Sequence, residues 1–199
     1  YDNVGIHYIM ILFMFIAGVN FSLHFRAISG DIKSYFRNSE FLTYFGLIAL
    51  VTVALTFSLV IKSGNWSHAF FLDSLFQTVS ILTTTGYATA DYELWAFFAQ
   101  FLILILMFIG GMGGSTGGGM KIVRVMLILK YAALETRRML HAKAIIPIRI
   151  GKKYISGDVI RNTLGFFLFY VFIFVFTSFF LTTLNIDLKS SMGVAASAL

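Results

Sequence analysis

A short run of threonine, glycine and tyrosine is the part of the sequence whose residue types most directly indicate chemistry. Residues 83–87 read Thr-Thr-Thr-Gly-Tyr and follow an apolar stretch over 69–82. Ion filters that replace the water shell of a cation with backbone carbonyls use a T-V-G-Y-G loop, in which glycine permits the twist that turns the carbonyls inward. The segment therefore predicts a carbonyl filter, and a polar turn where a helix leaves the membrane is the alternative. The predicted filter residues are Thr84, Thr85, Gly86 and Tyr87, with Ala88 in place of the last glycine.

A glycine-rich segment inside a later apolar stretch is the second candidate. Seven of the ten residues 110–119 are glycine. A continuous helix is not expected there, because each glycine costs on the order of 1 kcal/mol relative to alanine. A flexible loop at that depth would lie beneath the filter and act as a gate, whereas close helix packing through G-x-x-x-G is the alternative. A phosphate-binding loop is excluded, since no Gly-Lys-[Ser/Thr] occurs. The predicted gating residues are Gly110, Gly111, Gly113, Gly114, Ser115, Thr116, Gly117, Gly118 and Gly119.

Composition places both segments in a membrane. Of the 199 residues, 58% are hydrophobic and 12% are charged, and the mean hydropathy is +0.86. Soluble domains carry roughly 25% charged residues, so a water-soluble fold is excluded. The lack of cysteine excludes disulfides and thiolate metal sites. Four runs without charged residues exceed the roughly 20 residues that cross a bilayer as a helix. These runs are 3–25, 41–61, 94–120 and 162–186.

Charge asymmetry indicates how a fifth apolar stretch runs, residues 63–90, which only Asp73 interrupts. Two segments, 26–37 and 121–161, contain thirteen of the fifteen lysines and arginines. Loops rich in these residues stay in the cytoplasm, and both segments lie on that side only if 63–90 enters the membrane and returns. We therefore predict a re-entrant helix over 69–82 followed by an extended return. A helix that crosses the bilayer is the alternative.

The basic segment after the glycines is expected to anchor the protein at the cytoplasmic surface. Residues 122–140 predict a helix, and 145–155 predict a short hairpin in which Pro147 confines the first strand to an edge. Attraction to anionic lipid is the favoured role, and docking of a cytoplasmic regulatory partner is the sharper alternative. Nucleic-acid binding is not expected, because this charge is ordinary for a cytoplasmic loop. The residues expected to take part are Lys121, Arg124, Lys130, Arg137, Arg138, Lys152 and Lys153.

Catalytic and metal-binding patterns find no support. The histidines show no helical pairing, and no serine, histidine and acid form a nucleophilic arrangement. We therefore expect neither an enzyme nor a resident cofactor. A membrane scaffold or assembly subunit, whose glycines only pack helices, is the second function considered, and it requires 63–90 to cross the bilayer.

Four stretches together resemble one family: 13–21 with 24–26, then 80–91, 110–124 and 147–151. On these residues the chain is similar to the Trk/Ktr/HKT superfamily of potassium transporters, and within it to the TrkH-type membrane subunits of bacterial Trk uptake systems. The resemblance implies an all-α polytopic membrane protein with a potassium-channel-like plan. In that plan, four linked repeats of span, re-entrant pore helix with filter strand, and span surround one pore.

The resemblance also implies how the chain divides. Residues 1–30 would be the second span of the preceding repeat and its cytoplasmic turn, and 31–130 a complete repeat whose second helix is broken at 110–119. Residues 131–157 would be the basic cytoplasmic connection, and 158–199 the first span of the next repeat with the start of its pore helix. Because one of four filter strands is present, the chain is expected to be a fragment that cannot form the pore alone.

Ligand and partners are implied in the same way. K⁺ is the expected transported ion, held at Thr84, Thr85 and Gly86. Selectivity for K⁺ over Na⁺ stays open, since Ala88 replaces a filter glycine. The choice between a channel and ion-coupled transport also stays open. The expected partners are membrane lipid, the rest of the pore-forming chain, a second copy in a homodimer and a cytoplasmic nucleotide-binding regulatory subunit. The expected location is the bacterial inner membrane.

Overall fold

The structure, a computed structural model, describes residues 3–140, 148–151 and 153–199. Its contacts divide the chain into two compact units, Tyr1–Lys121 and Ile122–Leu199, which are described separately below.

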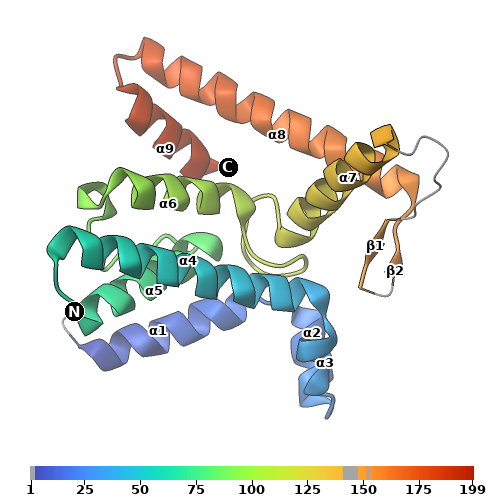
Figure 1. Ribbon diagram of the computed structural model, residues 1–199, viewed down its shortest axis with the longest axis horizontal. Coiled ribbons are helices and arrows are strands. Elements are labelled where there is room, and N and C mark those ends of the chain that lie inside the picture. Colours follow the sequence, from blue (N-terminus) through green and yellow to red (C-terminus); the bar gives the residue numbers. More distant parts are fainter. Residues whose placement is uncertain (1–2, 141–147, 152) are drawn as a thin grey trace. The chain divides into compact units, whose positions relative to one another are not determined.

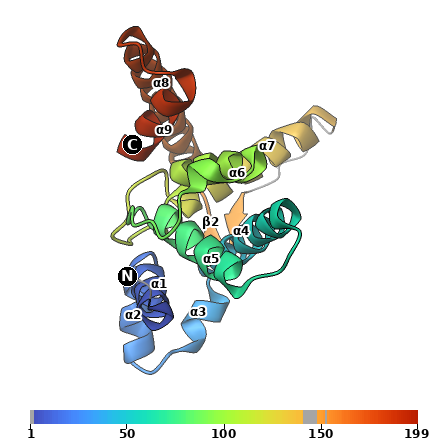
Figure 2. The same ribbon diagram turned by 90° about the vertical axis from the view of Figure 1, so that its left-hand side faces the viewer.

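The first unit is built around one short helix. Its elements are α1 (Val4–Ala17), α2 (Phe21–Ile28), α3 (Lys33–Arg37), α4 (Ser39–Ser63), α5 (His68–Leu82), a 3₁₀ turn η1 (Tyr92–Leu94) and α6 (Phe97–Ile109). Helix α5 contacts α1, α4 and α6, and Figures 1 and 2 show these three arranged around it. The C-terminal half of α5 is enclosed on all sides, since residues 76–80 are all buried, and Phe76 and Leu82 are among the most buried side chains. The centre of this unit is therefore a helix rather than a strand or a loop.

Helix α5 has the re-entrant form that the charge pattern predicts. Its 15 residues reach about 22 Å, less than the roughly 30 Å of a hydrocarbon core. After Leu82 the chain runs back along the helix, because Ser80 Oγ donates to Tyr87 O at 2.6 Å and Gln77 Nε2 donates to Ala90 O at 2.9 Å. A single crossing helix over 63–90, as a scaffold would require, is not observed.

The expected single helix over 3–25 is wrong. Helix α1 ends at Ala17, α2 begins at Phe21, and the two axes are bent by 101°. Gly18 explains the position of the break, since a Cβ there would lie 2.4 Å from Tyr44 Oη. Asn20 then begins the next helix by accepting a hydrogen bond from Ser22 N at 2.8 Å. A contact with α4 and a helix cap together override an apolar run that is continuous in the sequence.

The second unit contains α7 (Ile122–Leu140), β1 (Arg149–Ile150), β2 (Lys153–Tyr154), α8 (Gly157–Thr183) and α9 (Leu188–Ala198). Helix α7 has the predicted bounds, and the hairpin is antiparallel with Ile150 opposite Lys153. Pro147 lies outside the described residues. Leu127, Leu134 and Ile148 form a small buried cluster that packs the hairpin end on α7. Helix α9 returns along α8, as a second re-entrant helix would.

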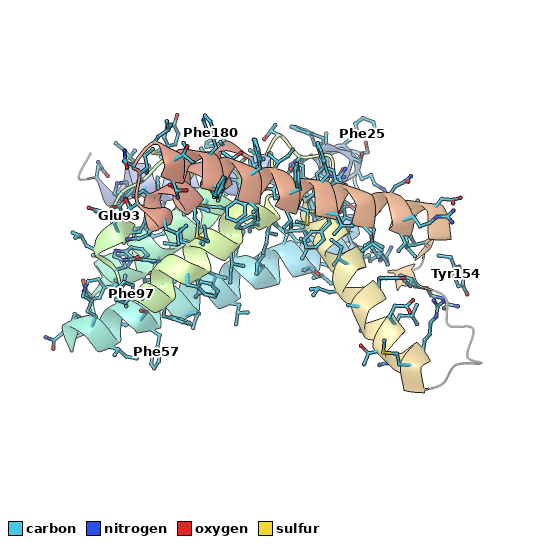
Figure 3. The ribbon with its side chains drawn as sticks, turned by 90° about the horizontal axis from the view of Figure 1, so that it is seen from above. Phe25, Phe57, Glu93, Phe97, Tyr154 and Phe180 are labelled. Atoms are coloured by element: carbon cyan, nitrogen blue, oxygen red, sulfur yellow. The ribbon has the colours of Figure 1, made fainter. Side chains whose placement is uncertain are left out.

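Exposed aromatic side chains are frequent on the long apolar helices. Within the described residues, α4 and α8 are long and apolar enough to cross a membrane, and only 11% of the apolar window of α8 is buried inside the protein. Figure 3 shows Phe57, Phe97 and Phe180 projecting outward from α4, α6 and α8. Such surfaces are stable only against hydrocarbon or another apolar partner. The fold is therefore an all-α membrane protein apart from one two-stranded hairpin.

Candidate ion filter and gating loop

The segment after α5 is held by its amides. Ser80 O accepts hydrogen bonds from Thr85 N at 2.8 Å and from Gly86 N at 3.5 Å. Gly86 has a φ of +81°, a conformation that glycine adopts without steric cost. The backbone N–H groups of the predicted filter thus face the helix that precedes them, as the return of the chain requires.

The carbonyls of the same segment are left available. Among the described residues, no hydrogen bond reaches the carbonyl oxygens of Thr84, Thr85 or Gly86. Residues 84–88 are exposed, whereas the preceding Thr83 is buried. Tyr87 differs from the other three predicted filter residues, since its carbonyl accepts from Ser80. Three successive carbonyls without a described protein partner, on an exposed backbone, are oxygen ligands of the kind that ion filters combine from several strands.

Two threonines fix the end of this segment that follows α5. Thr83 Oγ1 donates to Val79 O at 2.8 Å and lies 2.8 Å from Thr85 Oγ1, which ties the segment to the last turn of α5. Thr84 has a φ of +56°, a strained conformation for a β-branched residue. Strain of this kind costs about 1–3 kcal/mol and persists only where surrounding contacts impose it. Sequence reasoning did not single out Thr83 as an anchor.

The predicted gating loop lies directly against this end of the filter. Helix α6 stops at Ile109 and α7 starts at Ile122, and residues 110–121 contain no helix. Helix packing through G-x-x-x-G is therefore wrong for these glycines. Gly118 N donates to Thr84 Oγ1 at 2.8 Å, and a Cβ on Gly117 would lie 2.8 Å from Thr83 O. The two glycine-containing segments that the sequence marks are thus in contact.

The loop also joins the break between α1 and α2. Met112 N donates to Gly18 O at 3.0 Å, Thr116 N donates to Ala17 O at 3.3 Å, and Phe21 N donates to Gly114 O at 3.1 Å. Helix ends leave backbone groups without partners inside the helix. Here the end of α1 and the start of α2 satisfy these groups with the loop, so two interrupted segments far apart in sequence complete each other.

Two side chains that sequence reasoning missed hold one residue of the loop. Glu40 Oε1 accepts from Gly113 N at 2.6 Å, and Asn20 Nδ2 donates to Gly113 O. Both residues are half-buried. The signal in the sequence is a polar residue at an apolar run: Asn20 lies inside the run 3–25, and Glu40 directly precedes the run 41–61.

The predicted basic residues do not form one group. Lys121 belongs to the gating loop, where its Nζ contacts Ser115 Oγ at 3.1 Å and also Gly117 O. In the second unit, the Arg124 guanidinium lies 4.3 Å from the centre of the Phe166 ring. Lys130 Nζ donates to Arg149 O at 2.7 Å, so it braces the hairpin.

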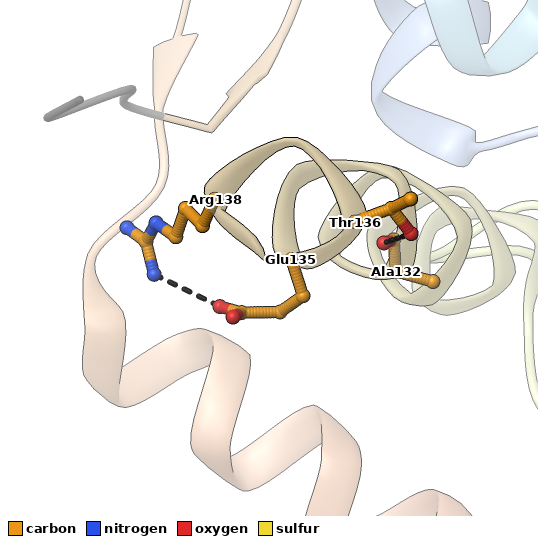
Figure 4. A network of polar contacts seen from close by, with 4 residues as sticks. All are labelled: Ala132, Glu135, Thr136 and Arg138. Carbon is orange, nitrogen blue, oxygen red and sulfur yellow. Dashed lines mark hydrogen bonds and ion pairs between the residues drawn. The ribbon is translucent and has the colours of Figure 1, made fainter. Parts of the chain in front are cut away.

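The last turns of α7 carry the remaining described arginines. Arg138 pairs with Glu135 at 2.9 Å, as Figure 4 shows, and Arg137 is exposed. Both ends of that pair are about two-fifths exposed, so the pair contributes at most about 1 kcal/mol. Lys152 lies outside the described residues, and only the backbone of Lys153 is described.

A comparison with protein families decides the relationship of the chain. The family model for TrkH, described as a cation transport protein, matches residues 1–199. The chain belongs to the TrkH family.

Named relatives agree with this assignment. The chain is 34% identical to the Trk system potassium uptake protein TrkH of Vibrio parahaemolyticus, over all of this chain and 42% of the relative. It is 32% identical to the protein of that name from Escherichia coli K12, over 94% of this chain and 39% of the relative. The Halomonas elongata protein is 37% identical over 87% of this chain and 36% of the relative. The chain thus spans about two-fifths of the length of these relatives.

A solved structure shows the same fold as this TrkH family member. The crystal structure of the potassium transporter TrkH from Vibrio parahaemolyticus matches with a TM-score of 0.91 at 35% sequence identity. The match covers 98% of this chain and 43% of that chain.

Proposed function

We propose that this chain supplies one filter strand and one gate to a potassium uptake pathway across the membrane. The observation that carries the proposal is the pairing of fixed amides with free carbonyls: Thr85 N and Gly86 N bond Ser80 O, while the carbonyls of Thr84, Thr85 and Gly86 accept no bond within the described residues. The printed names of the relatives, potassium uptake proteins, support K⁺ as the ion.

The filter acts by replacing water. Carbonyl oxygens of Thr84, Thr85 and Gly86 take the place of part of the ion's hydration shell, and further ligands come from other filter strands around the same pore. Because the amides are bonded to Ser80, the carbonyls cannot turn away without breaking those bonds. Carbonyls held in this direction offer the ion a fixed number of oxygen ligands, which is one basis for preferring one ion over another.

The loop over 110–119 acts as the gate beneath that filter. Gly118 N donates to Thr84 Oγ1, and this contact supports a gate next to the first filter residue. A segment so rich in glycine changes conformation easily, because glycine is not confined to one backbone region. Displacing the loop opens the path, and its return closes it.

Rubidium uptake tests the filter. In cells that express the protein at its natural full length, Gly86→Asp should abolish Rb⁺ uptake or its preference over Na⁺. Gly64→Asp is the matched control, because Gly64 has a similar φ of +75° against +81°, and a Cβ at either residue meets nothing within 4 Å. Unchanged uptake and selectivity in Gly86→Asp would refute the filter assignment.

Loop shortening tests the gate. Removal of residues 113–118 should raise Rb⁺ flux while the preference for Rb⁺ over Na⁺ stays the same. A flux that does not rise would mean that the loop only fills space between helices.

The repeat boundaries and the partners complete the proposal. Residues 31–130 form a full repeat, 1–30 close the preceding one, 131–157 connect on the cytoplasmic side, and 158–199 open the next. The basic residues of α7 and the hairpin bind anionic lipid of the bacterial inner membrane and a cytoplasmic nucleotide-binding regulatory subunit, and the whole protein is a homodimer. Crosslinking from Arg137→Cys, an exposed position on α7, to such a subunit would test the docking role.

A further inference from the structure

One backbone residue of the gating loop is held from both of its polar groups by side chains. The amide of Gly113 donates to Glu40 Oε1 at 2.6 Å, and its carbonyl accepts from Asn20 Nδ2. The partners lie 73 and 93 residues away in the sequence, in α4 and in the break before α2. Glycine has no side chain that a partner could contact. A glycine loop is therefore held in place through hydrogen bonds to its backbone N–H and C=O groups.

Local structure presents Glu40 for this contact. Asn38 begins α4, and its Oδ1 accepts from Glu40 N at 2.9 Å and from Phe41 N at 3.0 Å. Glu40 therefore stands in the first turn, where the helix dipole stabilises a carboxylate. Asn20 is fixed similarly, because its Oδ1 accepts from Ser22 N and only its amide nitrogen is left for the loop. Both side chains are thus set in place by local hydrogen bonds at the starts of α2 and α4.

Among the bonds that join residues 112–116 to α4 and to the α1–α2 break, the contact with Glu40 is the charge-assisted one. Lys121 Nζ also bonds Ser115 Oγ and Gly117 O, but those contacts lie within the loop. A hydrogen bond from a backbone amide to a half-buried carboxylate is roughly twice as strong as a bond between neutral groups. The other bonds that tie residues 112–116 to the helix break join neutral backbone groups or the Thr116 hydroxyl. Loss of the Glu40 carboxylate should therefore loosen the loop more than loss of any one of these neutral hydrogen bonds.

We propose that Glu40 and Asn20 are positioning residues that clamp Gly113 and hold the gating loop in its closed place under the filter. This inference rests on the proposed function, since it assigns the loop's closed position to two named side chains. Opening the gate requires the loop to leave both of them. The clamp also connects the gate to the turn that contains α2 and α3, because Asn20 precedes α2 and Glu40 follows α3.

Initial rates of Rb⁺ uptake over a range of Rb⁺ concentrations test the clamp in the full-length protein. Glu40→Ala should raise the maximal rate about tenfold with little change in half-saturation and in Rb⁺ over Na⁺ preference, as expected for losing one charge-assisted bond of the closed state. Glu40→Gln keeps an acceptor oxygen and should restore most of the closed behaviour. Asn20→Ala should raise the rate less, because the bond it removes is neutral.

Asp31→Ala is the matched control. It also removes an acid near the start of α4, and its side chain makes no contact with the loop among the described residues. The protein must be present in the membrane at equal amounts in every variant. Should Glu40→Ala fail to accumulate, Glu40→Gln and Asn20→Ala still decide the matter, since the clamp requires a smaller rise in each.

Two results separate the clamp from the gate itself. If Glu40→Ala and Asn20→Ala match the unmodified protein while removal of 113–118 raises flux, the clamp is refuted and the gate stands. If removal of 113–118 has no effect either, the proposed gate fails. A rise in Glu40→Ala that Asp31→Ala reproduces would assign the effect to surface charge and overturn the clamp.

Discussion

Adjacent glycines in the gating loop allow the steric contact between gate and filter to be tested with one added methyl group. A Cβ on Gly117 would lie 2.8 Å from Thr83 O and 3.2 Å from Thr84 Oγ1, whereas a Cβ on Gly118 would meet only Thr84 Oγ1, at 3.9 Å. Neither glycine has a positive φ, so both alanine variants carry the same small backbone effect. Only Gly117→Ala should force the loop and the filter apart.

The cost of that methyl group sets the expected size. Overpacking of this kind costs about 1–3 kcal/mol, which corresponds to a factor of about 5 to 160 in the equilibrium between the loop in place and the loop displaced. The loop should yield rather than the filter, because Thr83 is buried and bonded to Val79. Gly117→Ala should therefore raise Rb⁺ flux severalfold or more, and Gly118→Ala should leave it within about twofold.

The assay is Rb⁺ uptake at saturating concentration, normalised to the amount of protein in the membrane, with the Rb⁺ to Na⁺ ratio measured alongside. Equal flux in Gly117→Ala and Gly118→Ala would refute the reasoning. A changed Rb⁺ to Na⁺ ratio in Gly117→Ala would show that the filter moved instead of the loop. That result would contradict the expectation that the loop is displaced more easily than the filter.

Three further outcomes are expected. Gly18→Ala should lower the Tm of the purified protein by an amount equivalent to about 1–3 kcal/mol, because its Cβ would lie 2.4 Å from Tyr44 Oη, while Gly46→Ala, with nothing within 4 Å, should not lower it. Ser80→Ala removes the 2.6 Å bond to the carbonyl at the upper end of the filter and should reduce Rb⁺ over Na⁺ preference more than it reduces expression; an unchanged ratio would contradict this. The hydrogen bond from Ser190 N lowers the pKa of Asp187, so the contribution of this carboxylate to α9 is present at neutral pH and is lost as the pH falls through that lowered pKa. Hydrogen-exchange protection in α9, taken relative to the intrinsic exchange rate at each pH, should fall there, and this fall should be missing in Asp187→Ala.

Much of the fold follows from local patterns. The sequence predicts α7 with its observed bounds and α5 to within one residue, because polar residues and glycines interrupt each apolar run at its ends. The re-entrant path of 63–90 follows from the distribution of lysine and arginine, which is a property of the whole chain. The loop over 110–119 follows from glycine content, since each glycine in a helix costs on the order of 1 kcal/mol relative to alanine.

What could not be predicted depends on contacts between distant residues. The break at Gly18 lies within an unbroken apolar run, and only the nearby Tyr44 and Thr83 side chains explain it. The roles of Glu40 and Asn20 are hidden for the same reason, because their target is the backbone of a residue 73 or 93 positions away. Backbone recognition of this kind leaves no complementary side chain for a pattern to reveal.

The shared hydrogen bonds between the glycine loop and the α1–α2 break mean that neither interruption can be repaired alone. A substitution that lets α1 continue as a helix past Gly18 would draw Ala17 O and Gly18 O into helical bonds and leave Met112 N and Thr116 N without acceptors. The two sites should therefore be strongly non-additive in a double-mutant cycle. An exchange of segments between homologues should therefore succeed only when the break and the loop are moved together.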